Sequence, residues 1–174
     1  MWDRTREQAW ERTGLLKAMY EGEVSKAVFQ QVALMSLAAG LFRALQTPGV
    51  RLVLSERSPF SNAVFAKVNL AGMDLVAYEL TLQQLLGALP PHERHVLMLD
   101  APVPLLTERI ARRARDGEAG VDEGYMRQLA AAHDEWFEAD DPCSKARIDC
   151  SGPREEVEAK VAAHVAAIVR GGDV

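Results

Sequence analysis

An acid, a base and a hydroxyl group stand together directly after a short apolar run. Glu56, Arg57 and Ser58 follow residues 51–55, whose apolar character predicts a buried parallel strand. A carboxylate can accept a proton or bind Mg²⁺, and a guanidinium can hold a phosphate with two parallel hydrogen bonds. Because open α/β sheets bind ligands at the carboxyl ends of their strands, this order predicts phosphate chemistry at Glu56 and Arg57. A surface ion pair on a loop is the alternative interpretation.

A second chemical signal is a run of four arginines within seven residues, at positions 109, 112, 113 and 115. Arg109 and Arg113 are four residues apart and share one face of a helix. Two glycines follow within residues 116–120, so the segment 112–120 is predicted to be a lid that closes over a phosphate-bearing ligand. The alternative is a solvated helix end whose charge is balanced by the acids that follow it.

Positioning these groups requires strands that alternate with helices. The pattern predicts helices at 4–19, 24–46, 59–71, 74–88, 104–115, 122–138 and 154–170, and strands at 51–55, 95–100 and 146–150. Ser58 suits the N-cap of the helix that starts at Pro59. Alternation of this kind predicts an α/β fold with a parallel sheet covered on both faces. Three strands, all after residue 50, are few for a domain of this size.

Composition narrows the class of protein. The chain has 174 residues, 48% of them hydrophobic, which suits a single domain over residues 1–174. A net charge of −5 argues against nucleic acid as a partner. Two cysteines provide neither a disulfide framework nor a metal site. No apolar run is long enough for a bilayer and the first residues lack a signal peptide, so we expect a cytoplasmic protein without a membrane partner. A mitochondrial location stays open if an N-terminal extension is missing.

Several short segments carry a family resemblance. They are Glu56-Arg57-Ser58, the arginine-rich run 108–115 with Glu118, residues 125–129 leading to 133–136, residues 16–20, and Phe29-Gln30. In this order and at this spacing, the chain resembles the deoxynucleoside kinases, phosphotransferases that phosphorylate the 5′-hydroxyl of deoxynucleosides in nucleotide salvage. The resemblance covers nearly the whole chain and implies a P-loop kinase-like, three-layer α/β fold around a parallel sheet.

The resemblance assigns a nucleoside-binding role to five residues. Gln30 matches the glutamine that reads the base edge, and Phe29 lines the base pocket. Asn62 occupies a position that tunes base choice. Tyr20 and Glu118 match the residues that hold the 3′-hydroxyl of the sugar. A buried amide can discriminate between bases because an unpaired hydrogen-bonding group is costly.

The resemblance also assigns roles around the phosphates, with ATP and Mg²⁺ as the implied cofactors. Glu56 is placed near the Mg²⁺ and the reacting phosphates, and Arg57 near the 5′-oxygen. Arg109 matches an arginine near the ATP adenine, while Arg113 and Arg115 match lid arginines that contact phosphates. The family also implies a homodimer, with candidate faces near 59–71 and 122–138. Ordinary core packing is the alternative for both segments.

One part of the family pattern is absent from the sequence. No G-x-x-x-x-G-K-[ST] phosphate loop occurs, and neither do the strand before that loop and the second strand, which presents the general base. We therefore expect an N-terminally truncated kinase that is inactive as the isolated chain. The alternatives are a non-catalytic dimerisation or regulatory protein derived from such a kinase, a nucleoside-monophosphate kinase similar to thymidylate kinase, or an unrelated α/β protein.

The absent first strand has a structural consequence. In the family fold this strand lies in the middle of the sheet, between the strands predicted at 51–55 and 95–100. Without it both strands lack a neighbour, and buried unpaired backbone groups cost about 1–3 kcal/mol each. We therefore expect the chain to be marginally stable, to associate, or to refold locally.

Overall fold

The computed structural model describes residue 10, residues 12–113 and residues 121–171. The elements in chain order are α2 (Leu15–Tyr20), α3 (Lys26–Leu45), α4 (Pro59–Asn69), α5 (Gly72–Ala88), β1 (His95–Asp100), α6 (Val103–Arg113), α7 (Glu123–Glu138), β2 (Ser144–Asp149) and α8 (Arg154–Gly171). All helices predicted after residue 20 are present, and so are the last two strands. The α/β class is therefore confirmed.

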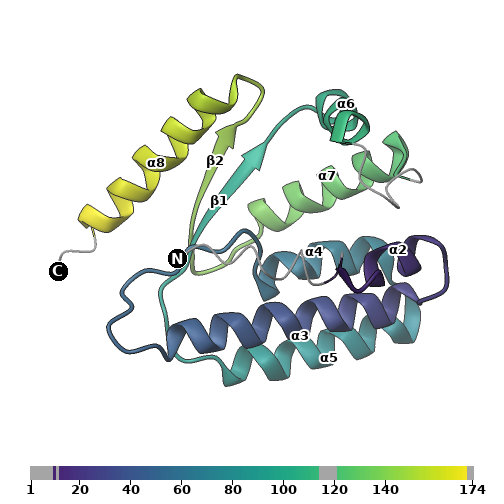
Figure 1. The fold of residues 1–174 in the computed structure, drawn as a ribbon. Coiled ribbons are helices and arrows are strands. Elements are labelled where there is room, and N and C mark those ends of the chain that lie inside the picture. The colour runs from purple at the N-terminus through teal and green to yellow at the C-terminus, as the bar shows by residue number, and fades with distance from the viewer. Residues whose placement is uncertain (1–9, 11, 114–120, 172–174) are drawn as a thin grey trace.

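The sheet consists of two parallel strands among the described residues. In its register Val96 lies opposite Lys145, and Met98 lies opposite Arg147. The ladder is extended at its end by the Cys150 N–H, which donates to the Asp100 carbonyl at 2.7 Å. Helix α8 lies on one side of the strands and α7 on the other (Figure 1), so the predicted cover of both faces is confirmed.

The strand predicted at 51–55 is wrong, because these residues have an extended, irregular backbone. Leu52 is 44% exposed and Leu54 is 53% exposed, so the segment is not buried as a parallel strand would be. Backbone groups in a strand need a neighbouring strand as their hydrogen-bond partner, and β1 is paired with β2 alone within the described part of the chain. The expectation of marginal stability, association or local refolding stays a prediction.

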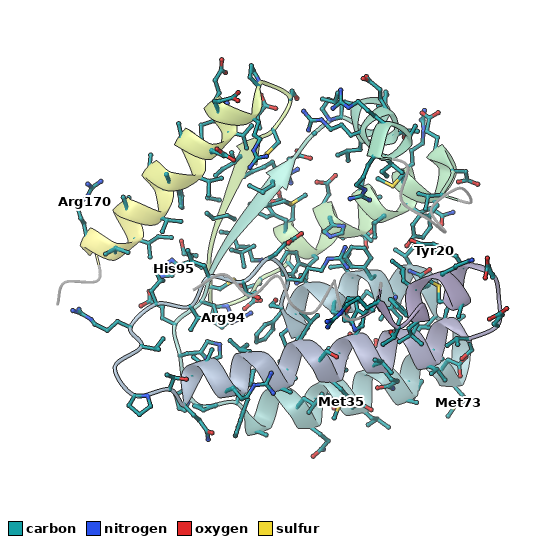
Figure 2. The ribbon with its side chains drawn as sticks, in the orientation of Figure 1. Tyr20, Met35, Met73, Arg94, His95 and Arg170 are labelled. Atoms are coloured by element: carbon teal, nitrogen blue, oxygen red, sulfur yellow. The ribbon has the colours of Figure 1, made fainter. Side chains whose placement is uncertain are left out.

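Because residues 51–55 are not a strand, Glu56 and Arg57 also lie at a different place from the predicted one. Helix α4, which follows them, has its first turn at the amino end of β1, where the Arg94 guanidinium lies 3.8 Å from the centre of the Phe60 ring. Figure 2 shows Arg94 beside His95, the first residue of β1. The expectation that Glu56 and Arg57 stand at the carboxyl end of a strand is consequently wrong.

The main core lies among the helices α3, α4 and α5. Its fully buried members are Leu34, Ala66, Leu70 and Tyr78, and apolar residues of the same helices surround them. By length and composition alone, α3 could also cross a membrane, with a mean hydropathy of 1.4 over its most apolar window. Because Leu34 at its middle is 0% exposed within this cluster, α3 acts here as a core helix.

Helix α4 begins as its sequence predicts. The Ser58 hydroxyl accepts a hydrogen bond from the Ser61 N–H at 3.2 Å, and the Ser58 N–H donates to Ser61 Oγ at 3.0 Å. This reciprocal pair is a capping box, and Pro59 takes the first helical position. The arrangement satisfies two of the backbone groups that a helix start leaves without partners.

The segments predicted as faces of a homodimer, 59–71 and 122–138, form α4 and α7. Helix α4 packs against α3, α5 and α7, and Lys67 is its one exposed residue. The exposed residues of α7 are mostly polar or charged, among them Glu123, Arg127 and Glu135. Packing within the chain therefore involves α4, and the homodimer stays a prediction.

Candidate functional site

A buried amide without a partner lies at the start of α3. Gln30 is 6% exposed, and its Oε1 atom accepts no hydrogen bond within the described part of the chain. Phe29 beside it is 8% exposed, and its ring meets that of Trp10 edge to face, with 5.7 Å between the centroids. Leaving a buried carbonyl unpaired costs about 1–3 kcal/mol, so Gln30 is prepared for a hydrogen-bond donor that the described residues do not supply.

Asn62 has a partner inside the protein. Its side-chain Nδ2 donates to the Tyr78 hydroxyl at 2.8 Å, and the two residues are 2% and 1% exposed. Burial raises the pKa of Tyr78 to about 12, while the hydrogen bond from Asn62 acts in the opposite direction. Asn62 thus joins α4 to α5, and the role predicted for it in base choice stays a prediction.

Arg57 precedes α4, and its guanidinium lies beside aromatic side chains. Its guanidinium is 4.3 Å from the centre of the Phe65 ring, and Phe65 in turn meets His133 of α7 edge to face at 5.4 Å. His133 holds its place through Nδ1, which donates to the Leu129 carbonyl at 2.8 Å. Glu56 is exposed and forms no ion pair or hydrogen bond with described residues, so the two residues do not pair on the surface either.

A cavity of about 440 Å³ lies instead at the carboxyl ends of the two strands. Its lining residues are Asp100, Ala101, Pro102, Arg147, Asp149 and Ser151. Arg147 spans it, because its Nη1 donates to Asp100 Oδ2 at 3.0 Å and to Asp134 Oδ1 at 2.7 Å. These hydrogen bonds, first to Asp134 and then to Asp100, raise the pKa of Arg147. Arg147 is not among the site residues predicted from the sequence, although a charged side chain within a predicted strand is itself a signal.

Helix α6 follows β1 and carries Arg109, Arg112 and Arg113. The charge of Arg109 acts on the thiol of Cys150, just after β2, where it opposes the larger effect of burial, which raises the pKa of Cys150. Arg113 is the last residue of α6. Arg115 and Glu118 lie outside the described residues. Tyr20 ends α2, is 39% exposed and lies on the opposite side of the view from Arg94 (Figure 2).

The predicted site residues are carried by several elements. Phe29 and Gln30 share the start of α3, Arg109 is on α6, and the Arg57 guanidinium faces the Phe65 ring of α4. Among the described residues, no group of three or more histidine, cysteine or acidic side chains is placed to hold a metal ion. Mg²⁺ commonly takes only one or two carboxylates and completes its shell with phosphates and water, so Glu56 is chemically suited to it. A triphosphate does not fit this chain equally well, because the sequence contains no phosphate loop.

Comparison with known proteins decides the family. The family model described as "Deoxynucleoside kinase" matches residues 3–170, nearly the full length of the sequence. The chain belongs to the deoxynucleoside kinase family. A search among curated proteins found no match for this kinase chain.

Solved structures share the fold of this deoxynucleoside kinase. Deoxyadenosine kinase from M. mycoides, with the products dCMP and a flexible dCDP bound, matches with a TM-score of 0.69 and 18% identity, over 87% of this chain and 80% of that chain. The same enzyme with bound dATP matches with a TM-score of 0.67 and 18% identity, over 86% and 79%. Its complex with dCTP matches with a TM-score of 0.64 and 16% identity, over 91% and 79%. The chain thus has the fold of the family even though its sheet contains two strands among the described residues.

Proposed function

We propose that this chain supplies the nucleoside-receiving side of an ATP-dependent deoxynucleoside kinase, which transfers the γ-phosphate to the 5′-hydroxyl of a deoxynucleoside. The observation that supports this proposal is the buried Oε1 of Gln30, which lacks a partner among the described residues and lies beside the Phe29 ring. A nucleobase offers both a flat apolar face and hydrogen-bond donors at its edge. A base therefore satisfies both properties of this position at once.

The chemistry of Gln30 favours bases that present an amino group. Adenine, cytosine and guanine each carry an exocyclic amine, which donates to a carbonyl oxygen. The M. mycoides enzyme has been solved with dATP and with dCTP bound, which carry adenine and cytosine. We therefore propose deoxyadenosine or deoxycytidine as the acceptor, with Tyr20 and Glu118 at the sugar and Asn62 near the base as predicted.

Around the phosphates, the arginines of the chain are proposed to supply positive charge. Arg57, Arg113 and Arg115 are proposed to hold phosphate oxygens through bidentate hydrogen bonds, with Arg109 nearer the adenine of ATP. Mg²⁺, when bound near Glu56, would neutralise phosphate charge. Because no phosphate loop occurs in these 174 residues, we assign no phosphoryl-transfer step to the chain alone. The family resemblance further predicts that the kinase acts as a homodimer.

Nucleoside binding, measured apart from turnover, tests this function. The purified chain is titrated with deoxyadenosine, deoxycytidine and their 5′-monophosphates by isothermal calorimetry, beside the variants Gln30→Leu and Gln31→Leu. Gln31 is the matched control, since it is the next glutamine of the same helix and is only partly buried. Gln30→Leu should weaken nucleoside binding by about 5- to 100-fold, which corresponds to the loss of one buried hydrogen bond. Gln31→Leu should bind as the wild type does.

The other outcomes favour the alternative functions. Tighter binding of the monophosphates than of the nucleosides would favour a nucleoside-monophosphate kinase. A folded chain that binds neither class would contradict the proposal and favour the non-catalytic, regulatory protein.

A further inference from the structure

The side chain of Arg147 joins α7 to both strands of the sheet. Its Nη1 donates to Asp134 of α7 at 2.7 Å and to Asp100 of β1 at 3.0 Å. The same guanidinium lies 4.8 Å from the centre of the Phe137 ring, and its Nη2 is 3.8 Å from Glu138 Oε1. Positions 134, 137 and 138 are three and four residues apart, so they share one face of α7. Arg147 thus holds this face from its place in β2.

A second cation of β2 holds the carboxyl end of α7. The Lys145 ammonium donates to the carbonyls of Phe137 at 2.9 Å and Ala139 at 2.6 Å, and more weakly to that of Trp136 at 3.3 Å. The last carbonyls of a helix have no partners within it, and a positive charge is favourable there. Residues two apart in a strand point to the same side. Lys145 and Arg147 therefore meet α7 together, one at its main chain and the other at its side chains.

The other side of α7 packs against α4. Helix α7 lies between the strands and α4 (Figure 1). The His133 ring meets the Phe65 ring of α4 edge to face at 5.4 Å, and Asn69 Nδ2 donates to the Tyr125 hydroxyl at 3.0 Å. The Arg57 guanidinium lies on that same Phe65 ring, 4.3 Å from its centre. Helix α7 thus connects the strands to the ring beside Arg57.

Two neighbouring residues of α7 make this connection. Asp134 meets Arg147, and His133 meets Phe65. Consecutive residues of a helix point about 100° apart, so one can face the strands while the other faces α4. Close-packed interiors transmit displacements. A tilt or a slide of α7 relative to the strands therefore changes the contact between His133 and Phe65.

We propose that Arg147 is a positioning residue, which fixes α7 against the strands and thereby keeps the Phe65 ring where Arg57 can lie on it and reach a phosphate. The inference rests on the proposed function, in which Arg57 holds phosphate oxygens. A single exposed ion pair stabilises little, but one guanidinium shared by three carboxylates forms a network. The planar fork of arginine suits this role, because it can serve several acceptors in a fixed geometry.

The position of α7 is measured without any ligand. In proton NMR, the Hε1 signal of His133 has a chemical shift that depends on the distance and tilt of the Phe65 ring. His133→Gln assigns this signal among the four histidines of the chain. Arg147→Met should move the signal toward its value in the unfolded protein. Asp134→Ala breaks the same hydrogen bond at an exposed position and should move it in the same direction, whereas Glu135→Ala, the matched control at the next exposed acid, should not.

The effect on Arg57 is measured with ligands. Calorimetry compares deoxycytidine with its 5′-monophosphate. In Arg147→Met the affinity for the monophosphate should fall by about 10-fold, which corresponds to one charge-assisted hydrogen bond, while the affinity for the nucleoside stays unchanged. When Arg57→Met is already present, Arg147→Met should cause no further loss of monophosphate affinity, because Arg147 acts through Arg57.

Three results would overturn the inference. They are an unmoved His133 signal in folded Arg147→Met, equal losses of affinity for both ligands, and losses from Arg57→Met and Arg147→Met that add. A wild type that binds neither ligand would contradict the proposed function, and the His133 signal would then decide alone whether Arg147 positions α7. If circular dichroism shows that Arg147→Met does not fold, Asp134→Ala takes its place in every comparison.

Discussion

At the scale of single residues, Asn62 has a hydrogen-bond partner in the protein that its sequence position did not predict. Its sequence position resembles one that tunes base choice, yet its amide donates to Tyr78 in the core between α4 and α5. Nothing in the residue types around Asn62 distinguishes these roles, because Tyr78 is 16 residues away and meets it only through the packing of two helices. The buried Gln30 Oε1, by contrast, has no hydrogen-bond partner among the described residues, as a ligand-facing amide should.

Removal of the Asn62 amide should therefore destabilise the fold. In Asn62→Ala the Tyr78 hydroxyl stays buried without its donor, and the free energy of unfolding should fall by about 1–3 kcal/mol. Asn69→Ala is the control, since Asn69 donates to the Tyr125 hydroxyl at 3.0 Å in a partly buried place, and its loss should cost less. Urea denaturation followed by circular dichroism measures both. An unchanged unfolding midpoint in Asn62→Ala, with an altered nucleoside preference, would instead support the role at the base.

Tyr78 should make the chain sensitive to alkali. An unfolded tyrosine loses its proton near pH 10, whereas burial raises the pKa of Tyr78 to about 12 in the folded state. The contribution of Tyr78 to stability is thus complete below about pH 10 and is lost as the pH rises toward 12, by roughly 2 kcal/mol. Urea midpoints measured across this range should fall steeply for the wild type and for Tyr125→Phe, but less for Tyr78→Phe. Equal slopes in all three proteins would show that Tyr78 is not the cause.

At the scale of elements, local signals predicted the helices better than the strands. Periodic apolar residues and caps such as Ser58 lie within the element they define, so α3, α4 and α8 could be predicted almost to their ends. A strand is completed by its neighbours. Residues 51–55 have the composition of a buried strand, but their backbone has no neighbouring strand among the described residues. The predicted position of Glu56 and Arg57 depended on that strand, so this prediction was wrong as well.

Hydrogen exchange should separate this segment from the true strands. No backbone N–H of residues 52–55 donates a hydrogen bond within the described part of the chain, and both Leu52 and Leu54 are exposed. Their amides should exchange nearly as fast as those of an unfolded peptide, while amides that join β1 to β2 should be protected. Mass spectrometry of peptides that cover 51–55 and 95–100 provides the comparison. Equal protection of both segments would show that 51–55 pairs as a strand after all.

At the scale of the whole molecule, the chain combines a well-packed helical layer with an open sheet. Four fully or nearly buried residues anchor α3, α4 and α5, whereas Leu99 of β1 is 58% exposed. The family and the α/β class could be predicted from ordered short motifs, because those motifs survive in this chain. The grouping of the site could not, because Arg147, Asp100 and Asp134 meet through tertiary packing across β1, α7 and β2.

The absence of a phosphate loop from the sequence predicts how the purified chain behaves in a kinase assay. In the proposed function, deoxynucleoside binding uses the helical layer with Gln30. Phosphoryl transfer also needs a cradle for the triphosphate, which in this family is a phosphate loop absent from the 174 residues. With ATP, Mg²⁺ and saturating deoxyadenosine or deoxycytidine, the chain should give no nucleoside monophosphate above the rate without protein. Calorimetry on the same sample should still detect the nucleoside, which excludes misfolding as the cause. Robust ATP-dependent product would mean that peptide nitrogens or arginines within these residues hold the triphosphate unaided. In that case Arg57→Ala, Arg109→Ala and Arg113→Ala would identify which of them does so.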